Sequence, residues 1–282
     1  MSYLYRFGIP IVGFGLLLFG WVKYQEASGI FFPSQYHKSR LNRLPESVEF
    51  VRFESTDGVE LTGLYKSGQP DSPVVVFTHG NAGHMLNRLP WLSTILPEDW
   101  TGLILDYRGY GLSGGSPSVS GVKKDARSAV QYALQRSESD RLFLYGRSLG
   151  VPMAAYASQF NRAEGIVLES GFPNTRSVAS EILPVPGIGY LLSVEMNTVD
   201  YIEKAEEKHG ELRKLVIHGT EDKVLPVSLG RQLFERLPGP KQKFIVDGAG
   251  HNDLRRVAGK RYDQTIRRFL TQNDASGSPV AR

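Results

Sequence analysis

The sequence has no cysteine in its 282 residues. This absence excludes disulfide bonds, a thiolate nucleophile and cysteine-ligated zinc, although it leaves the redox compartment open. Internal repeats and low-complexity tracts are also absent. What remains is an ordinary globular composition, 41% hydrophobic and 22% charged. It has room for one large core and little chain left over for a second domain.

A strong net charge is lacking as well. The chain carries 33 basic and 29 acidic residues, a formal net charge of +4, and the basic residues form no long run. We interpret this small excess as solvated surface and therefore expect no nucleic-acid partner.

The N-terminus differs in kind from the rest of the chain. Residues 7–22 are uncharged and mostly apolar, and they lie between Arg6 and Lys23. As a helix they would span about 24 Å, so snorkelling flanks would have to complete a hydrocarbon core of about 30 Å. A cleaved signal peptide is the main alternative, but residues 23–27 make a poor cleavage site. We therefore expect an uncleaved signal anchor, a transmembrane helix that makes this a single-pass membrane protein.

The sequence says less about which side of the membrane the remaining chain faces. Four basic residues follow the apolar run at positions 23, 38, 40 and 43, whereas only Arg6 and the terminal amine precede it. By the positive-inside rule this excess favours a cytoplasmic catalytic domain. It is small, and the orientation stays open.

Beyond residue 46 the chain alternates short strand-like and helix-like stretches. The strand-like stretches are rich in Val, Ile, Leu or Phe and cover residues 48–53, 60–65, 74–78, 102–107, 141–145, 165–168, 212–218 and 243–246. Helical stretches lie near residues 85–96, 119–136, 151–160, 227–236 and 255–271. This alternation predicts a doubly wound, mostly parallel α/β sheet, and the turn at residues 56–58 predicts that it begins with an antiparallel pair. Ligands of such sheets bind beyond the carboxyl ends of the strands.

The interval 171–210 breaks this rhythm, because prolines and glycines occupy the place of a single crossover helix. Long insertions tend to be lids or binding loops, so we favour a small helical cap, with a long structural crossover as the alternative. The predicted organisation is an anchor at 1–24, a linker at 25–46, a catalytic domain at 47–272 and a flexible tail at 273–282.

The most informative motif is G-x-S-x-G at residues 146–150, between a strand-like run and a helical one. A sharp turn there projects a serine hydroxyl clear of the sheet, and the glycines make room for the strained backbone. Ser148 is therefore the candidate nucleophile. A second match at residues 111–115 lies in a glycine-rich loop with no helix starting at its serine, so we set Ser113 aside.

A serine nucleophile needs a histidine base. Three histidines follow Ser148, and His251 lies in a glycine-rich loop after the last strand, which suits a mobile base. His209 lies in a charged helical patch, and we interpret it as solvated surface. His218 ends a strand, where we expect it to stabilise a loop.

The base in turn needs a carboxylate. Asp222 lies just past a strand end and directly before a helix, and its short side chain suits a fixed hydrogen bond to imidazole. Glu221 is the alternative. Asp247 and Asp253 lie too close to His251 in a turning loop to be preferred.

Stabilisation of the oxyanion requires two backbone amides. One is Leu149, directly after the nucleophile, and we assign the other to Asn81 in the loop 79–83, with Ala82 as its alternative. His79 precedes the nucleophile and ends a strand, so we expect a structural hydrogen bond from it. No metal and no organic cofactor is implied.

Together these motifs resemble the membrane-anchored branch of the α/β-hydrolase superfamily. They are H-G-N-A-G at 79–83, D-Y-R-G-Y-G at 106–111, G-R-S-L-G at 146–150, His218-Gly219 with Asp222, and Gly250-His251. That branch holds serine-aminopeptidase-like bacterial proteins and eukaryotic proteins that cleave acyl groups from lipids or palmitoylated proteins. The resemblance covers about residues 48–270. It implies an α/β-hydrolase fold and a Ser-Asp-His triad, and it says little about the substrate.

We therefore expect a membrane-anchored serine hydrolase that cleaves esters or thioesters of acyl-containing small molecules, lipids or acylated proteins. This preference rests on the anchor and on apolar residues of the predicted cap, namely Ile182, Leu183, Ile188, Leu191 and Leu192. A peptidase or amidase of the serine aminopeptidase type is one alternative. A non-catalytic, membrane-tethered binding module is the other.

Overall fold

The computed structural model describes residues 30–182 and 194–271. The predicted anchor at 1–24, the predicted tail at 273–282 and residues 183–193 of the predicted cap lie outside this part. Within the described ranges, no helix is both long and apolar enough to cross a membrane.

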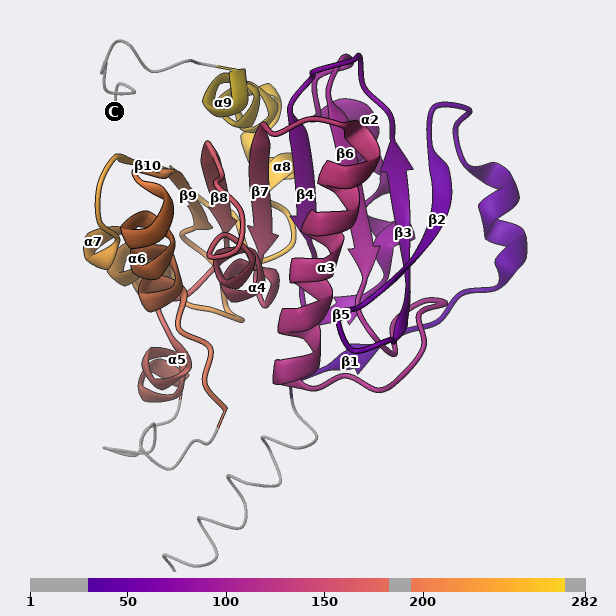
Figure 1. Cartoon of the computed structure of the whole chain (residues 1–282). Coiled ribbons are helices and arrows are strands. Elements are labelled where there is room, and N and C mark those ends of the chain that lie inside the picture. The colour runs from indigo at the N-terminus through magenta and orange to yellow at the C-terminus, as the bar shows by residue number, and fades with distance from the viewer. Residues whose placement is uncertain (1–29, 183–193, 272–282) are drawn as a thin grey trace, which may run out of the picture.

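An eight-stranded sheet forms the centre of the molecule (Figure 1). Its strands, in spatial order, are β10 (Lys241–Val246), β9 (Arg213–Gly219), β8 (Gly165–Glu169), β7 (Leu142–Arg147), β4 (Val74–Thr78), β6 (Thr101–Asp106), β3 (Glu60–Lys66) and β2 (Glu49–Glu54). The pairs β2–β3 and β3–β6 are antiparallel, and all other pairs of this sheet are parallel. The predicted mostly parallel sheet with antiparallel N-terminal strands is confirmed.

The central strands are buried on both faces because alternate residues enter two different cores. In β4, Val74 and Val76 belong to one core, whereas Val75 and Phe77 belong to the other. One face is covered by α3 (Val119–Ser137), α4 (Gly150–Ala157), α6 (Thr198–His209) and α7 (Val227–Arg236), and the opposite face by α2 (Leu89–Thr94), α8 (Leu254–Ala258) and α9 (Lys260–Thr271) (Figure 1). Two covered faces explain why these strands are continuous apolar runs in the sequence.

Two stretches predicted as single helices are each divided. Residues 85–96 form a 3₁₀ turn, η2 (Met85–Asn87), and then α2. Pro90 causes this break, because it has no N–H to bond to the preceding turn and fits only the start of a new helix. Residues 255–271 divide into α8 and α9 at Gly259, whose φ of +55° is easily adopted only by glycine.

The interval between β8 and β9 holds two helices in its described part, α5 (Thr175–Ile182) and α6. Helix α6 packs against α4 and α7, so it lies in the helical layer as a crossover helix does. Helix α5 lies beyond the carboxyl ends of the strands (Figure 1). The interval thus crosses the sheet through α6 and adds α5 at the end where ligands are expected.

A short parallel pair that the sequence did not predict lies at the same end. Strand β1 (Phe32–Pro33) pairs with β5 (Ala82–Gly83), and the Phe32 N–H donates to the Asn81 carbonyl at 2.9 Å. The chain that follows the predicted anchor is therefore attached directly to the loop 79–83.

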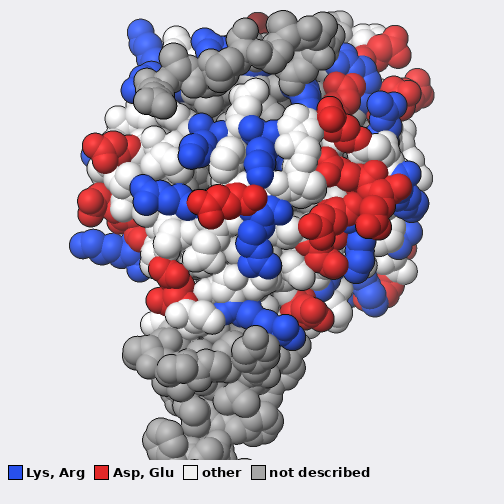
Figure 2. All heavy atoms as spheres, turned by 90° about the vertical axis from the view of Figure 1, so that its left-hand side faces the viewer, with Lys and Arg blue, Asp and Glu red and all other residues white. Residues whose placement is uncertain are grey.

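The surface charge is mixed where it is visible in Figure 2. Lysine and arginine side chains alternate with aspartate and glutamate over this face, with no continuous basic area. This distribution is typical of a solvated surface.

Candidate active site

The candidate residues follow strands at the carboxyl edge of the parallel sheet. Strand β4 lies between β6 and β7, so the chain order reverses at β4, and ligand sites of doubly wound sheets form at such a switch point. The loop 79–83 follows β4, and Ser148 follows β7. The sequence of strands therefore brings the predicted nucleophile and the predicted oxyanion loop to one place.

Ser148 occupies a strained turn between β7 and α4. Its φ is +53°, which few non-glycine residues adopt. The turn is held by the Ser148 N–H, which donates to the Glu169 carbonyl at 2.8 Å, and by the Ser148 carbonyl, which accepts from the Val151 N–H at 2.9 Å. This is the geometry of a nucleophile elbow.

The two motif glycines allow this turn because backbone approaches backbone there. A Cβ at position 150 would lie 1.9 Å from the Thr78 carbonyl oxygen, and one at position 146 would lie 2.6 Å from the Val151 Cα. The Thr78 hydroxyl also donates to the Gly150 carbonyl at 2.8 Å. The elbow is thus locked against β4.

Ser113 lies in a different environment. Its hydroxyl donates to the Asp106 carbonyl at 2.8 Å and accepts from the Thr62 N–H at 2.9 Å. These bonds tie the glycine-rich loop to β3 and β6, which is a structural role.

The structure brings Ser148, His251 and Asp222 into one hydrogen-bonded chain. The Ser148 hydroxyl lies 3.1 Å from His251 Nε2, and His251 Nδ1 donates to Asp222 Oδ2 at 2.7 Å. These three residues are separated by 74 and 29 positions along the chain, taken as 222 − 148 and 251 − 222. The imidazole therefore has one nitrogen facing the hydroxyl and the other fixed by the carboxylate.

Asp222 is held rigidly in its ionised form. Burial disfavours the carboxylate, but hydrogen bonds from His218 and His251 and from the Leu225 N–H hold the pKa of Asp222 below its usual range. Its Oδ1 accepts from the N–H groups of Val224 and Leu225 at 2.9 and 2.8 Å. A fixed anion of this kind orients the imidazole and stabilises its protonated state.

The alternative acids make other contacts. Asp247 accepts from the Thr220 hydroxyl at 3.1 Å, and Asp253 accepts from the Gly250 N–H at 2.7 Å. The Glu221 N–H donates to the Ala249 carbonyl at 2.8 Å, and no contact between its carboxylate and His251 is found among the described residues. Among these acids, Asp222 is thus the one that is hydrogen-bonded to His251.

His218 has a second contact that the sequence did not reveal. Its Nε2 donates to the Leu225 carbonyl at 2.8 Å, as a loop-stabilising residue would, and lies 3.3 Å from Asp222 Oδ2. It therefore supports the acid loop and the acid itself. His209, by contrast, lies at the end of α6, with its Nε2 3.0 Å from the Gln159 carbonyl.

The loop 79–83 passes directly beside the nucleophile. A Cβ on Gly80 would lie 3.4 Å from the Ser148 Cβ. The Asn81 carbonyl is held by the Phe32 N–H and by the Tyr110 hydroxyl, at 2.9 and 2.6 Å. Leu149 is the N-cap residue of α4. The amides of Asn81 and Leu149 remain our prediction for the oxyanion hole.

Two buried polar groups hold the loop, His79 at its start and Asp106 just beyond its end. The Asp106 carboxylate accepts from the Met85 N–H at 2.6 Å, and His79 donates from Nδ1 to the Gly80 carbonyl at 2.7 Å. Burial lowers the pKa of His79 to about 3, so its ring is neutral at physiological pH. Burial also raises the pKa of Asp106 to about 7, although the bond from Met85 opposes that shift.

Asp106 makes the stability of the protein depend on pH. Its folded-state pKa lies above the value of about 3.9 in an unfolded chain, so its contribution is fully present below about pH 4 and is lost as pH rises to about 7. Asp106→Asn removes this loss. We predict that the free energy of unfolding of the variant, relative to that of the wild type, increases by about 2 kcal/mol between pH 5 and pH 8, measured by urea unfolding. A difference that does not change with pH would contradict this assignment.

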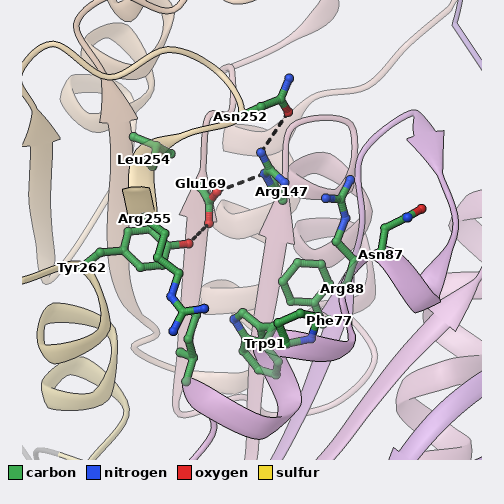
Figure 3. Close-up of a pocket in the computed structure, with 12 residues that line it drawn as sticks. Phe77, Asn87, Arg88, Trp91, Arg147, Glu169, Asn252, Leu254, Arg255 and Tyr262 are labelled. Carbon is green, nitrogen blue, oxygen red and sulfur yellow. Dashed lines mark hydrogen bonds and ion pairs between the residues drawn. The ribbon is translucent and has the colours of Figure 1, made fainter. Parts of the chain in front are cut away.

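A further network beside the triad was missed from the sequence. Arg147, the residue before Ser148, donates from Nη2 to the His251 carbonyl at 2.9 Å. It also donates to Asn252 Oδ1 at 3.0 Å (Figure 3). Its Nε lies 3.0 Å from Glu169 Oε1. Arg147 therefore connects the nucleophile strand to the loop that carries the base.

Glu169 is the fixed end of this network. It is the last residue of β8 and is buried, and its Oε2 accepts from the hydroxyls of Tyr145 and Tyr262, the latter at 2.6 Å. A charged residue at the end of an otherwise apolar strand was the signal in the sequence. No charge pattern showed that its partner would be Arg147.

Arg147 is a positioning residue on this account. Replacing it with glutamine removes a charged hydrogen bond to the His251 loop, so we predict that kcat for a chromogenic ester falls by about tenfold to a hundredfold while KM stays within a factor of about two. Arg147→Lys should recover part of the rate. The measurement is steady-state ester hydrolysis.

Arg141 provides the matched control. It lies just before β7, at the other end of this strand, and forms a bidentate ion pair with Glu164 at 2.7 and 3.0 Å. Arg141→Gln removes an arginine–glutamate pair that is more exposed and lies at the other end of the strand, so it should leave kcat unchanged. Equal effects of the two substitutions would show that Arg147 only stabilises the fold.

Metal binding receives no support from the side chains. Among residues 30–182 and 194–271, no three His, Asp or Glu side chains are grouped as metal ligands would be.

A mostly parallel sheet with a nucleophile elbow and this chain of three side chains defines an α/β-hydrolase. The family described as serine aminopeptidase, S33, matches residues 69–187, and the protein belongs to that family. An uncharacterized protein of Mycobacterium tuberculosis, Rv2307c, is 30% identical over 95% of both chains. Protein bem46 of Schizosaccharomyces pombe is 28% identical over 94% of this chain and 91% of its own length.

Solved structures agree on the fold. The esterase Pf2001 of Pyrococcus furiosus has a TM-score of 0.64 at 19% identity, covering 86% of this chain and 97% of that chain. An α/β-hydrolase of Vibrio vulnificus has a TM-score of 0.65 at 19% identity, covering 85% and 96%. At 19% identity these similarities show that the fold is shared, and they do not identify a substrate.

Proposed function

We propose that the protein is a serine hydrolase that cleaves acyl esters or thioesters through an acyl-enzyme. The observation that carries this proposal is the hydrogen-bonded chain from Ser148 through His251 to Asp222. His251 takes the hydroxyl proton as Ser148 attacks the acyl carbonyl, and then gives that proton to the leaving group. Water, activated by the same imidazole, releases the acid and restores Ser148.

The tetrahedral intermediate carries a negative charge that backbone amides stabilise. The N–H groups of Leu149 and Asn81 are assigned this role, because Leu149 follows the nucleophile and the loop of Asn81 passes beside it. Attachment of that loop to Phe32 and Tyr110 keeps it in place before the substrate arrives.

An acyl ester fits this site better than a peptide with a free amino terminus. An aminopeptidase needs a carboxylate that is free to bind the substrate ammonium group. Among the described residues, Glu169 beside the triad is already bound to Arg147, and Asp222 within the triad is bound to His218 and His251. The esterase of Pyrococcus furiosus shares the fold, which makes ester hydrolysis compatible with it. Of the apolar cap residues, Ile182 is 48% exposed, and the other four lie outside the described residues.

A substrate panel tests both the chemistry and the preference. We predict turnover of p-nitrophenyl esters and little turnover of aminoacyl arylamides. Ser148→Ala should lower kcat by at least about 10⁴-fold and Asp222→Asn by about 10⁴-fold, since the triad acts as a unit. Ser113→Ala is the matched control and should retain the activity. Turnover of arylamides alone would favour the aminopeptidase alternative.

We further propose that residues 1–24 anchor the protein in a membrane beside its active site. The apolar run at 7–22 supports the anchor. The pairing of β1 with β5 supports its position, because the chain arrives at the oxyanion loop within ten residues of position 24, counted as 33 − 24 = 9. Such an arrangement would present the nucleophile to substrates dissolved in lipid.

Removal of residues 1–24 tests the anchor. We predict that the full chain sediments with membranes and resists alkaline carbonate extraction, whereas the shortened protein stays in the supernatant. Full-length Ser148→Ala is the control and should sediment like the wild type, because catalysis is not needed for anchoring. A soluble full-length chain would contradict the anchor and leave the esterase proposal standing.

A further inference from the structure

A cavity of about 150 Å³ lies behind the loop that carries His251. Its walls come from α2, from the carboxyl ends of β7 and β8, and from α8 and α9. Figure 3 shows Arg147 between Asn252 and Glu169, with Arg88 on the side away from Glu169. Ser148 does not line this cavity. The cavity is therefore distinct from the predicted catalytic centre, although Arg147 contacts both.

The charges around this cavity do not balance. Arg255 is neutralised by Asp263, at 2.9 and 3.0 Å, and Glu169 compensates Arg147. Arg88 forms no ion pair within the part of the chain that the structure describes. Burial, and then repulsion from Arg147, lowers the pKa of Arg88 to about 10, although attraction to Glu169 opposes this shift. Arg88 therefore leaves one positive charge in the cavity wall uncompensated.

Unused hydrogen-bond donors are found in the same wall. Arg88 Nε and Trp91 Nε1 are both buried, and neither has a hydrogen-bond partner among the described residues. The acceptors nearby are occupied, because Glu169 binds the two tyrosines and Arg147, and Asn252 Oδ1 binds Arg147. Buried donors normally have partners. A wall with free donors, occupied acceptors and excess positive charge favours an anion over a cation.

We propose that this cavity binds a phosphate group between Arg88 and Arg147. The planar guanidinium fork matches a tetrahedral oxyanion and forms paired, charge-assisted hydrogen bonds with it. The bound group would also accept from Arg88 Nε, which has no other partner among the described residues. This inference goes beyond the proposed hydrolase activity, because it needs neither Ser148 nor turnover.

Binding there has a consequence for the active site. Arg147 donates to the His251 carbonyl from the same guanidinium that faces the cavity. A phosphate that fixes this guanidinium would restrain the His251 loop. Phosphate should therefore change the rate of ester hydrolysis as well as bind.

Calorimetric titration of the purified full-length protein with inorganic phosphate tests the proposal, with sodium chloride keeping the ionic strength constant. We expect saturable binding, and at least about tenfold weaker binding by Arg88→Gln, because that change removes the unpaired charge. Arg268→Gln, which removes an exposed arginine of α9, is the matched control and should bind like the wild type. Arg88→Lys keeps the charge without the fork and should bind with intermediate affinity.

Two further arms identify the source of the phosphate and separate this site from catalysis. Ser148→Ala should bind phosphate unchanged, so the result does not depend on the hydrolase proposal. Glycerol 3-phosphate and a soluble short-chain phosphatidic acid distinguish a small metabolite from a lipid headgroup, and binding of either that requires Arg88 supports the site. Absence of binding to all three probes, or binding that Arg88→Gln leaves unaltered, would overturn it.

Discussion

The contact between the nucleophile elbow and β4 is the constraint on which the remaining structure depends. The carbonyl of Thr78 occupies the place of a side chain at Gly150, and the hydroxyl of Thr78 donates back to the Gly150 carbonyl. This approach fixes Ser148 at positive φ, just after β7, and β7 is the neighbour of the strand β4 that leads into the loop 79–83. Backbone strain of this kind persists only where the surroundings hold it. The strained backbone and the position of the Ser148 hydroxyl therefore depend on this packing contact.

His251, the histidine of the predicted triad, is held from two sides, and this division explains much of the polar structure at the sheet edge. From β9, the buried Asp222 fixes the imidazole through Nδ1. From β7, Arg147 fixes the backbone of the same loop and is itself held by Glu169. The contact with Asp222 fixes which ring nitrogen carries the proton, and the contact with Arg147 fixes the position of the backbone that carries the ring. An anion in the cavity beside Arg88 would act on the second contact alone.

The fold and the convergence of Ser148, His251 and Asp222 could be predicted because the sequence carries a signal for each. Apolar runs marked the strands, the glycines marked the elbow, and chain order selected His251 and Asp222. The Arg147–Glu169 pair and the support from His218 could not be predicted, because they depend on which strands become neighbours. Pro90 and Gly259 are residues that interrupt helices, but the helical pattern on both sides of each led to the prediction of a single helix. The strands β1 and β5 have two residues each, too few to show the hydrophobic alternation by which strands are predicted.

The central claim is that the hydroxyl of Ser148 is the activated one. Labelling of the full-length protein with a fluorophosphonate, followed by mass spectrometry of the digested adduct, measures this directly. The account predicts one adduct, on Ser148, whose formation slows strongly in Asp222→Asn because His251 loses its fixed orientation. An unlabelled protein, as a non-catalytic binding module would be, or an adduct on Ser113 or another serine, would contradict it.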